Sequence, residues 1–487
     1  MPRVPLDIAG NAYESSSKRV AAQECVNMFA KVAETTGALN PVSLFTSPGV
    51  TRVATLPTGA YRAHELLNDE LYVVSGSAFY KIASDWTVTS LGAINGSGRC
   101  SISSNGETIA IQVPGGDGYW YDTSNGLQTI TDATYQSFQA QTNGVRAVTT
   151  KDGYFVFVTE RESFLSDLVT LNGGRGFPQL SFFTAEIKPD NNVTTATIRN
   201  ELYVVGKDTI ELFQNTGVGD SQPFQRIENA TIDRGLAAQF TFIEHIDDFV
   251  FIGGGKQERV SIYRGTPGGS VKISTTGIDD VLSVFTELEI SQAYAFSYQE
   301  SGNFFCGFTI KDKTLIYDTT SSVLLQRPIW HTRESASSSS GQWRCANVVD
   351  VYAKNVVLDT EDGRVGVLSR ETSTEYGEII ARRFSGQYLS NSGAALFINE
   401  IEAATDTGSL TVDGQTIKLE VSFDAGRTWS DYGSVSIGTL TTYDKRQIWR
   451  RIGRVPYQAV FRLSMDNTDA TNIVQMFAEV QGGTKWL

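Results

Sequence analysis

The chain has few of the residues that usually carry metal binding, redox chemistry and acid–base catalysis. Only 3 histidines and 4 cysteines occur among its 487 residues. The cysteines lack the short paired spacing that structural zinc or a dithiol site needs, and the histidines are equally scattered. Because cysteine behaves as a small apolar residue, we expect buried free thiols, no metal and no cofactor. The residues concerned are Cys25, Cys100, Cys306, Cys345, His64, His245 and His331.

Basic residues and long apolar runs are also scarce. The 40 lysines and arginines are outnumbered by 54 aspartates and glutamates, which gives a formal net charge of −14. No run of about five like charges occurs, which argues against a basic arm that wraps nucleic acid. No stretch approaches the roughly 18 apolar residues of a membrane helix, and the first residues lack a signal-peptide core. We expect synthesis in the cytoplasm and no membrane insertion by this chain.

Seven copies of a short phrase recur along the chain, each with one or two turn residues followed by β-branched and aromatic residues. The copies are spaced 37 to 55 residues apart. A second apolar run usually follows, and Asn-Gly or Asp-Gly pairs supply the positive φ values that tight hairpins require. This period indicates a repeat architecture built from meanders of short antiparallel strands. The copies begin at Asn68, Asn105, Asp152, Asn200, Asp247, Gly302 and Asn355.

Units of this length, each with about four strands, are typical of a β-propeller, in which radial packing buries both faces of every small sheet. We therefore predict an all-β fold with a propeller over residues 60–380, with seven blades preferred and six as the alternative. The third unit fits least well because residues 171–176 interrupt it with a Gly-rich insertion. A solenoid is less favoured, since the units lack a strict ladder motif.

Two regions lie outside the repeats. Residues 381–487 alternate again as strands and predict a smaller C-terminal β-sandwich. Residues 1–59 form an N-terminal extended segment that we expect to pack with this sandwich, because propellers often bring their chain ends together. Within that segment, residues 17–33 fit either an amphipathic helix or extended strand with loop, and periodicity does not distinguish the two.

One local motif is sharp: residues 422–429 fit the S-x-D-x-G-x-T-W pattern of an Asp box, which resembles turns on sialidase propellers. In such a turn the aspartate accepts backbone hydrogen bonds, glycine takes the left-handed position and tryptophan anchors the hairpin. A sialidase carries several boxes and a catalytic carboxylate, whereas this chain has one box after the repeats. We interpret Ser422, Asp424, Gly426, Thr428 and Trp429 as a structural hairpin and nominate no catalytic residue.

The most basic segment covers residues 445–454. On a helix its arginines at intervals of four form one stripe, and on a strand they share a face with Ile448 and Ile452. Arginine around tryptophan is enriched in protein interfaces and also contacts phosphate. The alternative is a solvated or internally ion-paired rim. The candidate interface residues are Lys445, Arg446, Trp449, Arg450, Arg451 and Arg454.

The same segment carries a family resemblance. Residues 443–454 resemble the Y-D-K-R-x-x-W-x-R-x-G-R signature of packaged-DNA stabilisation proteins, the tail hub or nozzle proteins of short-tailed bacteriophages (podoviruses). Residues 25–29 and 44–50 resemble the V-N-M and P-G motifs near the start of that family, and residues 208–213 resemble its S-T-I-E-Y-F. These motifs occur in the family's order over nearly the whole chain.

The resemblance implies a structural, non-enzymatic virion protein. It implies a homo-hexamer in the phage tail beneath the portal and its adaptor, which closes the channel after packaging and stabilises the packaged DNA. Neighbours would be a tail needle or plug and tailspikes or fibres, and DNA would pass through without sequence-specific binding. An acidic chain suits this passage, since a basic lining would hold the phosphates. The alternatives are a glycan-binding or glycan-cleaving propeller and a generic propeller for protein interaction.

Overall fold

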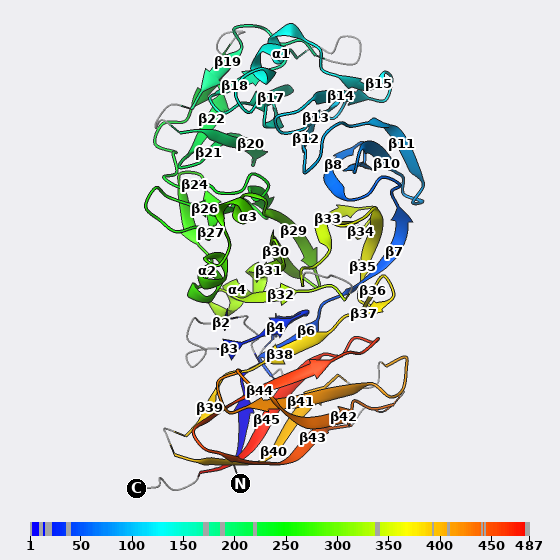
Figure 1. Ribbon diagram of the computed structural model, residues 1–487, viewed down its shortest axis with the longest axis vertical. Helices are drawn as coiled ribbons and strands as arrows, with labels where there is room; N and C mark the ends of the chain where they lie inside the picture. Colours follow the sequence, from blue (N-terminus) through cyan, green and yellow to red (C-terminus); the bar gives the residue numbers. More distant parts are fainter. Residues whose placement is uncertain are drawn as a thin grey trace.

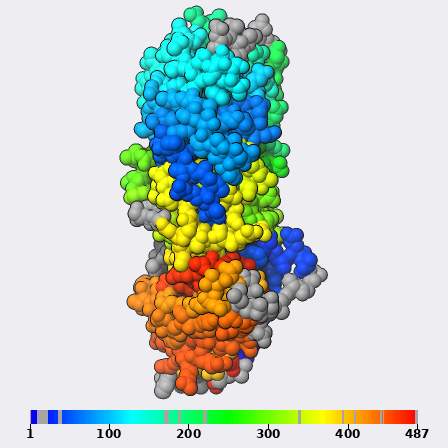
Figure 2. Space-filling view, turned by 90° about the vertical axis from the view of Figure 1, so that its right-hand side faces the viewer, coloured from blue at the N-terminus to red at the C-terminus, as the bar shows by residue number. Residues whose placement is uncertain are grey.

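The computed structural model contains two bodies, a ring of small sheets and a β-sandwich stacked against the rim of the ring (Figures 1 and 2). Both chain ends lie at the sandwich end (Figure 1). The structure describes residues 2–8, 13–14, 22–35, 40–168, 175–185, 190–217, 222–336, 341–391, 394–406, 410–439, 442 and 445–482.

The first four blades of the ring are antiparallel meanders. Blade one contains β8 (Tyr61–Leu67), β9 (Glu70–Ser75), β10 (Ala78–Ile82) and β11 (Val88–Ala93). Blade two contains β12 (Ser101–Ser104), β13 (Ile109–Gln112), β14 (Gly118–Asp122) and β15 (Gly126–Thr129). Blade three contains β16 (Ala147–Lys151), β17 (Tyr154–Val158), β18 (Glu162–Leu165) and β19 (Phe182–Thr184). Blade four contains β20 (Asn192–Ile198), β21 (Glu201–Gly206), β22 (Ile210–Asn215) and β23 (Phe224–Arg226).

Three further blades complete the ring. Blade five contains β24 (Gly235–Leu236), β25 (Ile243–His245), β26 (Asp248–Gly254), β27 (Ser261–Thr266) and β28 (Gly269–Lys272). Blade six contains β29 (Tyr294–Glu300), β30 (Asn303–Ile310), β31 (Lys313–Asp318) and β32 (Trp330–Arg333). Blade seven contains β33 (Cys345–Val351), β34 (Lys354–Asp359), β35 (Arg364–Ser369) and, from the N-terminal segment, β7 (Gly49–Thr55). The prediction of an all-β propeller is confirmed, with the preferred seven blades.

The recurring turns have the geometry that their residues suggested. Asn68 and Asp69, between β8 and β9, have φ values of 53° and 60°. Arg199 and Asn200, between β20 and β21, have φ values of 51° and 64°. Two successive positive φ values match the right-handed twist of the flanking strands in a two-residue hairpin. Each turn therefore starts the second strand of a blade in a defined register.

Both faces of a blade are buried because successive side chains of a strand point in opposite directions. On β9, Val73 packs toward blade seven with Val349 and Leu358. Its neighbour Val74 packs toward blade two with Ile109. Burying one such side chain contributes about 1.5–3 kcal/mol, so continuous apolar strands stabilise the ring.

In the described part of the ring, four short helices connect strands: α1 (Ala133–Gln139), α2 (Thr276–Leu282), α3 (Glu287–Ser291) and α4 (Thr319–Leu325). The predicted insertion at residues 171–176 follows β18, and within it only Arg175 and Gly176 are among the described residues. The chain returns to the core at Phe177, which stacks on Trp120 of blade two with 5.9 Å between ring centroids.

The sandwich core contains Ile401, Leu419, Phe461 and Met476. One sheet contains β43 (Gln447–Val455), β40 (Leu396–Thr405), β45 (Ile473–Gly482), β6 (Val42–Thr46) and β5 (Met28–Val32), with β1 (Arg3–Leu6) beside β45. The other contains β38 (Arg382–Ser385), β44 (Gln458–Met465), β41 (Thr416–Ser422) and β42 (Ser430–Ser436), with β39 (Leu389–Ser390) beside β44. The prediction of a C-terminal β-sandwich is confirmed.

The N-terminal segment contributes to both bodies. Strand β7 closes blade seven, whereas β1, β5 and β6 belong to a sandwich sheet. At the junction of the two bodies, β4 (Cys25–Val26) pairs with β32 of blade six on one side and with β38 of the sandwich on the other. One sheet is therefore continuous across the junction. Of the two structures considered for residues 17–33, the described part from residue 22 is extended, and residues 17–21 lie outside the described residues. Short strands are β2 (Tyr13–Glu14), β3 (Ala22–Gln23), β36 (Thr374–Glu375) and β37 (Glu378–Ile379).

Candidate interface surfaces

The scarce histidines and cysteines do not form a metal centre in the described part of the chain. All four cysteines are buried and free. Within the described ranges, no three His, Cys, Asp or Glu side chains gather as metal ligands. No described helix has both the length and the apolar character needed to cross a membrane. The candidate functional features are therefore the surfaces of the two bodies and the contacts between them.

The Asp box forms the turn between β41 and β42. Asp424 Oδ1 accepts hydrogen bonds from the backbone N–H groups of Arg427 (3.1 Å) and Thr428 (2.8 Å). The Thr428 hydroxyl donates to Asp424 Oδ2 at 2.6 Å, and Ser422 Oγ accepts from the Gly426 N–H at 2.7 Å. Hydrogen bonds lower the pKa of Asp424 to about 2, and those from Thr428 contribute most. This geometry is that of a self-contained turn, and the role of the motif as a structural hairpin stays a prediction.

The Asp box also borders a cleft. The Arg462 guanidinium lies over the Trp429 ring, 4.2 Å from the ring centroid. Gly426, Trp429 and Arg462 line one side of a cleft of about 330 Å³, and Gly277 and Ile278 of α2 line the other. The motif therefore stands where the sandwich faces the propeller.

The predicted basic segment is a strand, β43, paired with β40. Arg446 forms an ion pair with the nearly buried Glu402, which also pairs with Arg3 from β1. Arg450 Nε lies 3.2 Å from Glu400 Oε2. Lys445, Arg446, Arg450, Arg451 and Arg454 are exposed. Five of the six predicted interface residues thus lie on the surface, and two have internal acidic partners.

Trp449 requires a correction, because its side chain is only 4% exposed and packs in the sandwich core. Its indole Nε1 donates to the Gly433 carbonyl at 3.0 Å. The strand alternation also differs from the expectation, since Arg451 has a φ of 64° and the β40–β43 register shifts nearby. This bulge turns Ile452 into the core beside Trp449, so the arginines do not share one face with both isoleucines.

A chain of seven charged side chains crosses the junction between the two bodies. The series starts on β42 and continues across the neighbouring strands of the sandwich sheet. It then includes Glu24, next to β4, and ends at Glu334, which follows blade six. The contacts are Asp431–Lys418 (3.1 Å), Lys418–Glu420 (3.4 Å), Glu420–Arg462 (2.8 Å), Arg462–Glu24 (3.8 Å), Glu24–Arg383 (2.9 Å) and Arg383–Glu334 (2.8 Å). We call this set the junction ladder. Acids and bases alternate along it, so each inner charge has an opposite charge on both sides.

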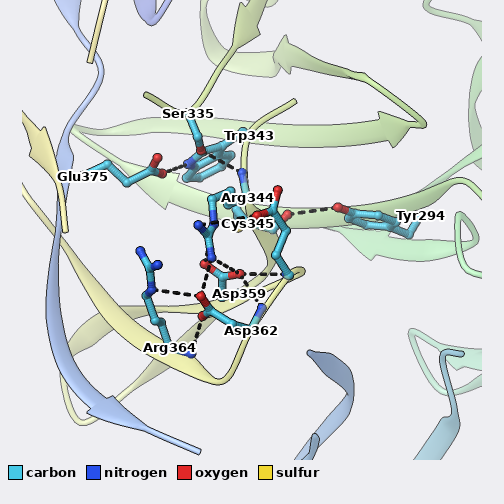
Figure 3. Close-up of polar contacts among 10 residues, drawn as sticks. Tyr294, Ser335, Trp343, Arg344, Cys345, Asp359, Asp362, Arg364 and Glu375 are labelled. Carbon is cyan, nitrogen blue, oxygen red and sulfur yellow. Dashed lines mark hydrogen bonds and ion pairs between the residues drawn. The ribbon is translucent and has the colours of Figure 1, made fainter. Parts of the chain in front are cut away.

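A second polar network lies in blade seven, where β7 closes the ring (Figure 3). Arg344 donates two hydrogen bonds to the buried Asp359 carboxylate, one from Nε at 3.0 Å and one from Nη2 at 3.1 Å. Nearby, the Trp343 indole donates to Glu375 at 2.9 Å, and burial raises the pKa of Glu375. Sequence reasoning missed both networks because their members are distant in the chain or carry no motif. Only the Asp424 turn had a local signal.

Comparison with known proteins gives the family. A family model described as "Bacteriophage P22 Gp10, beta-propeller" matches residues 2–373, and one described as "Bacteriophage P22 Gp10, beta-sandwich" matches residues 381–481. The tail hub protein gp10 of Salmonella phage P22 is 22% identical over 457 residues, which cover 90% of this chain and 91% of that protein.

Solved structures with similar folds are more distant. The extracellular domain of a putative one-component system from B. thetaiotaomicron is 9% identical with a TM-score of 0.42, and the match covers 72% of this chain and 43% of that one. The Neurospora crassa Pan2 WD40 domain is 8% identical with a TM-score of 0.39, over 67% of this chain and 97% of that one. At these TM-scores the likeness bears on neither function nor partners.

The two family models follow the order of the two bodies and together span nearly the whole chain. The resemblance drawn from residues 443–454 and the N-terminal motifs is thereby confirmed. This chain belongs to the bacteriophage P22 Gp10 family.

Proposed function

We propose that this protein is a structural hub of a short-tailed phage tail, made in the host cytoplasm and assembled into the virion as a homo-hexamer. The observation that carries the proposal is the match of both bodies, in order, to a family whose curated relative is named a tail hub protein. We divide the chain into two domains, a propeller of residues 60–380 that β7 completes and a sandwich of residues 381–487. No residue is assigned a catalytic role.

The propeller axis is not a path for DNA. Arg99, just before blade two, stacks on Tyr294 of blade six at 3.6 Å and donates to the Ala346 carbonyl of blade seven at 3.3 Å. On the other side, Gln239 of blade five donates to the Arg146 carbonyl beside blade three at 2.8 Å. These side chains join blades that are not neighbours, so they cross the centre of the ring. A duplex whose major groove alone is about 12 Å wide does not pass there.

The DNA channel of the hub is therefore formed between copies. A ring of six copies uses one heterologous contact six times, and the rotation closes without an unmatched surface. The portal and adaptor lie above this ring, and a needle or plug with tailspikes or fibres attaches to it. The net charge of −14 favours a channel that holds DNA by confinement and lets it slide, since few phosphates are neutralised by the protein.

The copy number in purified particles tests this function. Quantitative mass spectrometry against the major capsid protein is expected to give about six copies per particle, the number that closes one ring. Absence from particles contradicts the hub function. A fluorogenic glycoside panel run on the same protein separates the glycan-cleaving alternative, because release of sugar contradicts a purely structural role.

A further inference from the structure

We infer that the exposed cations on β43 and just before it bind the acidic surface of a second copy of this chain, and so form one half of the contact that repeats around the hub. This inference rests on the proposed function. We call the surface the arginine face; it consists of Lys445, Arg446, Arg450, Arg451 and Arg454.

The arginine face is held outward by the core beneath it. Trp449 and Ile452 are each 4% exposed and anchor β43 from inside. Opposite them, the side chains of Arg446 and Arg450 are 53% and 70% exposed. Because Arg451 adopts a left-handed φ of 64°, the bulge turns an additional cation to the surface. The strand cannot rotate these charges inward without removing Trp449 from the core.

The positive charge of this face is only partly neutralised. Its five cations meet two acidic partners, Glu400 and Glu402, which leaves a local charge of 5 − 2 = +3. The remainder of the chain then carries −14 − 3 = −17. Among the described residues, no ion pair is formed by Lys445, Arg451 or Arg454. A strongly acidic body with one cationic face is electrostatically complementary to itself in a head-to-tail contact.

A protein surface fits this face better than a nucleic acid. Phe397, paired with Arg454 across the β40–β43 ladder, is 44% exposed, and Tyr457 in the following turn is 71% exposed. Aromatic residues among arginines are typical of protein interfaces. Guanidinium groups form two parallel hydrogen bonds with carboxylates and with phosphates alike, so the exposed aromatic side chains are what favour a protein partner. The partner is therefore a carboxylate-rich protein surface, and the ring supplies it from the neighbouring copy.

Site-specific photo-cross-linking inside purified particles identifies the partner. Benzoyl-phenylalanine replaces Arg454 in one preparation and the exposed Arg259, in blade five, in a control. Cross-linking from position 454 into a species of twice the chain mass, containing only this protein, is the expected result. Cross-links from position 454 to DNA or to another tail protein, or none at all, overturn the inference. The copy number of the chain in the same particles tests the proposed function separately.

A charge-reversal pair tests the same contact by assembly. R451E/R454E and the control K256E/R259E change the net charge equally at exposed positions. We expect R451E/R454E to lower the amount of hub in particles by about tenfold or more, because like charges now face each other, while the control assembles normally. Equal melting temperatures of the purified variants establish that both fold. Normal incorporation of R451E/R454E overturns the inference.

Discussion

Arg383 and Glu24 form an ion pair at 2.9 Å although 359 positions separate them in the chain. The same Arg383 guanidinium holds Glu334 at 2.8 Å. One side chain of the sandwich therefore ties the N-terminal segment and the end of blade six to the same point. The contact therefore restrains the angle between propeller and sandwich.

Replacing Arg383 with methionine is expected to weaken the junction. The variant removes the cation of the junction ladder that joins Glu24 to Glu334, at a cost of about 1 kcal/mol per pair at low salt. Denaturant unfolding at low and high NaCl measures this, and added salt should reduce the difference between variant and wild type because it screens the ladder. Lys418→Met, which removes a more exposed cation with two acidic partners on the sandwich side of the ladder, serves as the matched control. A larger effect of Lys418→Met would contradict the central role of Arg383.

Asp359→Ala is expected to destabilise ring closure far more. The Arg344 side chain is 5% exposed and loses both contacts to Asp359. Because Glu361 (3.4 Å) and Asp362 (2.6 Å) still contact Arg344, the loss is expected to stay below the cost of about 3–5 kcal/mol for a buried guanidinium left with no partner. Calorimetric unfolding of the full chain measures the loss. Asp362→Ala, which removes a more exposed partner of the same arginine, is expected to cost no more than about 1 kcal/mol. Similar losses in the two variants would show that burial does not govern this network.

The repeat and the turns were predictable from the sequence because their signals are local. Asn68-Asp69 alone encodes a two-residue hairpin. The hydrogen bonds of the Asp424 turn are all formed within seven residues. The pairing of β7 with β35 has no local signal, since any exposed strand of suitable length satisfies the same backbone groups. The Arg383–Glu24 contact is equally invisible in one sequence. At β43 the bulge at Arg451 reverses the side-chain alternation, so period-2 reasoning placed Ile452 with the arginines, whereas composition alone suggested Trp449 as an interface residue.

Trp449→Ala separates the core of the sandwich from its surface. The variant removes a buried indole and its hydrogen bond to Gly433, so we expect a loss of about 3–5 kcal/mol in unfolding free energy. Arg450→Ala, the adjacent exposed residue, is expected to change stability by no more than about 1 kcal/mol. Urea unfolding compares the unfolding free energies of the two variants. It is followed by far-UV circular dichroism, which reports the backbone and does not depend on tryptophan fluorescence. A stability loss in Arg450→Ala as large as that in Trp449→Ala would contradict the assignment of Trp449 to the core.

The Asp box gives a pH dependence with a defined sign. Hydrogen bonds led by Thr428 lower the folded-state pKa of Asp424 to about 2, below the usual aspartate value of about 3.9. A depressed carboxylate pKa contributes stability that is complete above the unfolded value and is lost as pH falls through the folded one. Asp424→Asn is therefore expected to lower the melting temperature at pH 7, with a difference from wild type that shrinks as the pH falls from about 4 toward 2. Asp413→Asn, on an exposed turn of the same sandwich, controls for general charge effects. A difference between Asp424→Asn and wild type that stays constant over this range would mean that the carboxylate charge does not support the turn.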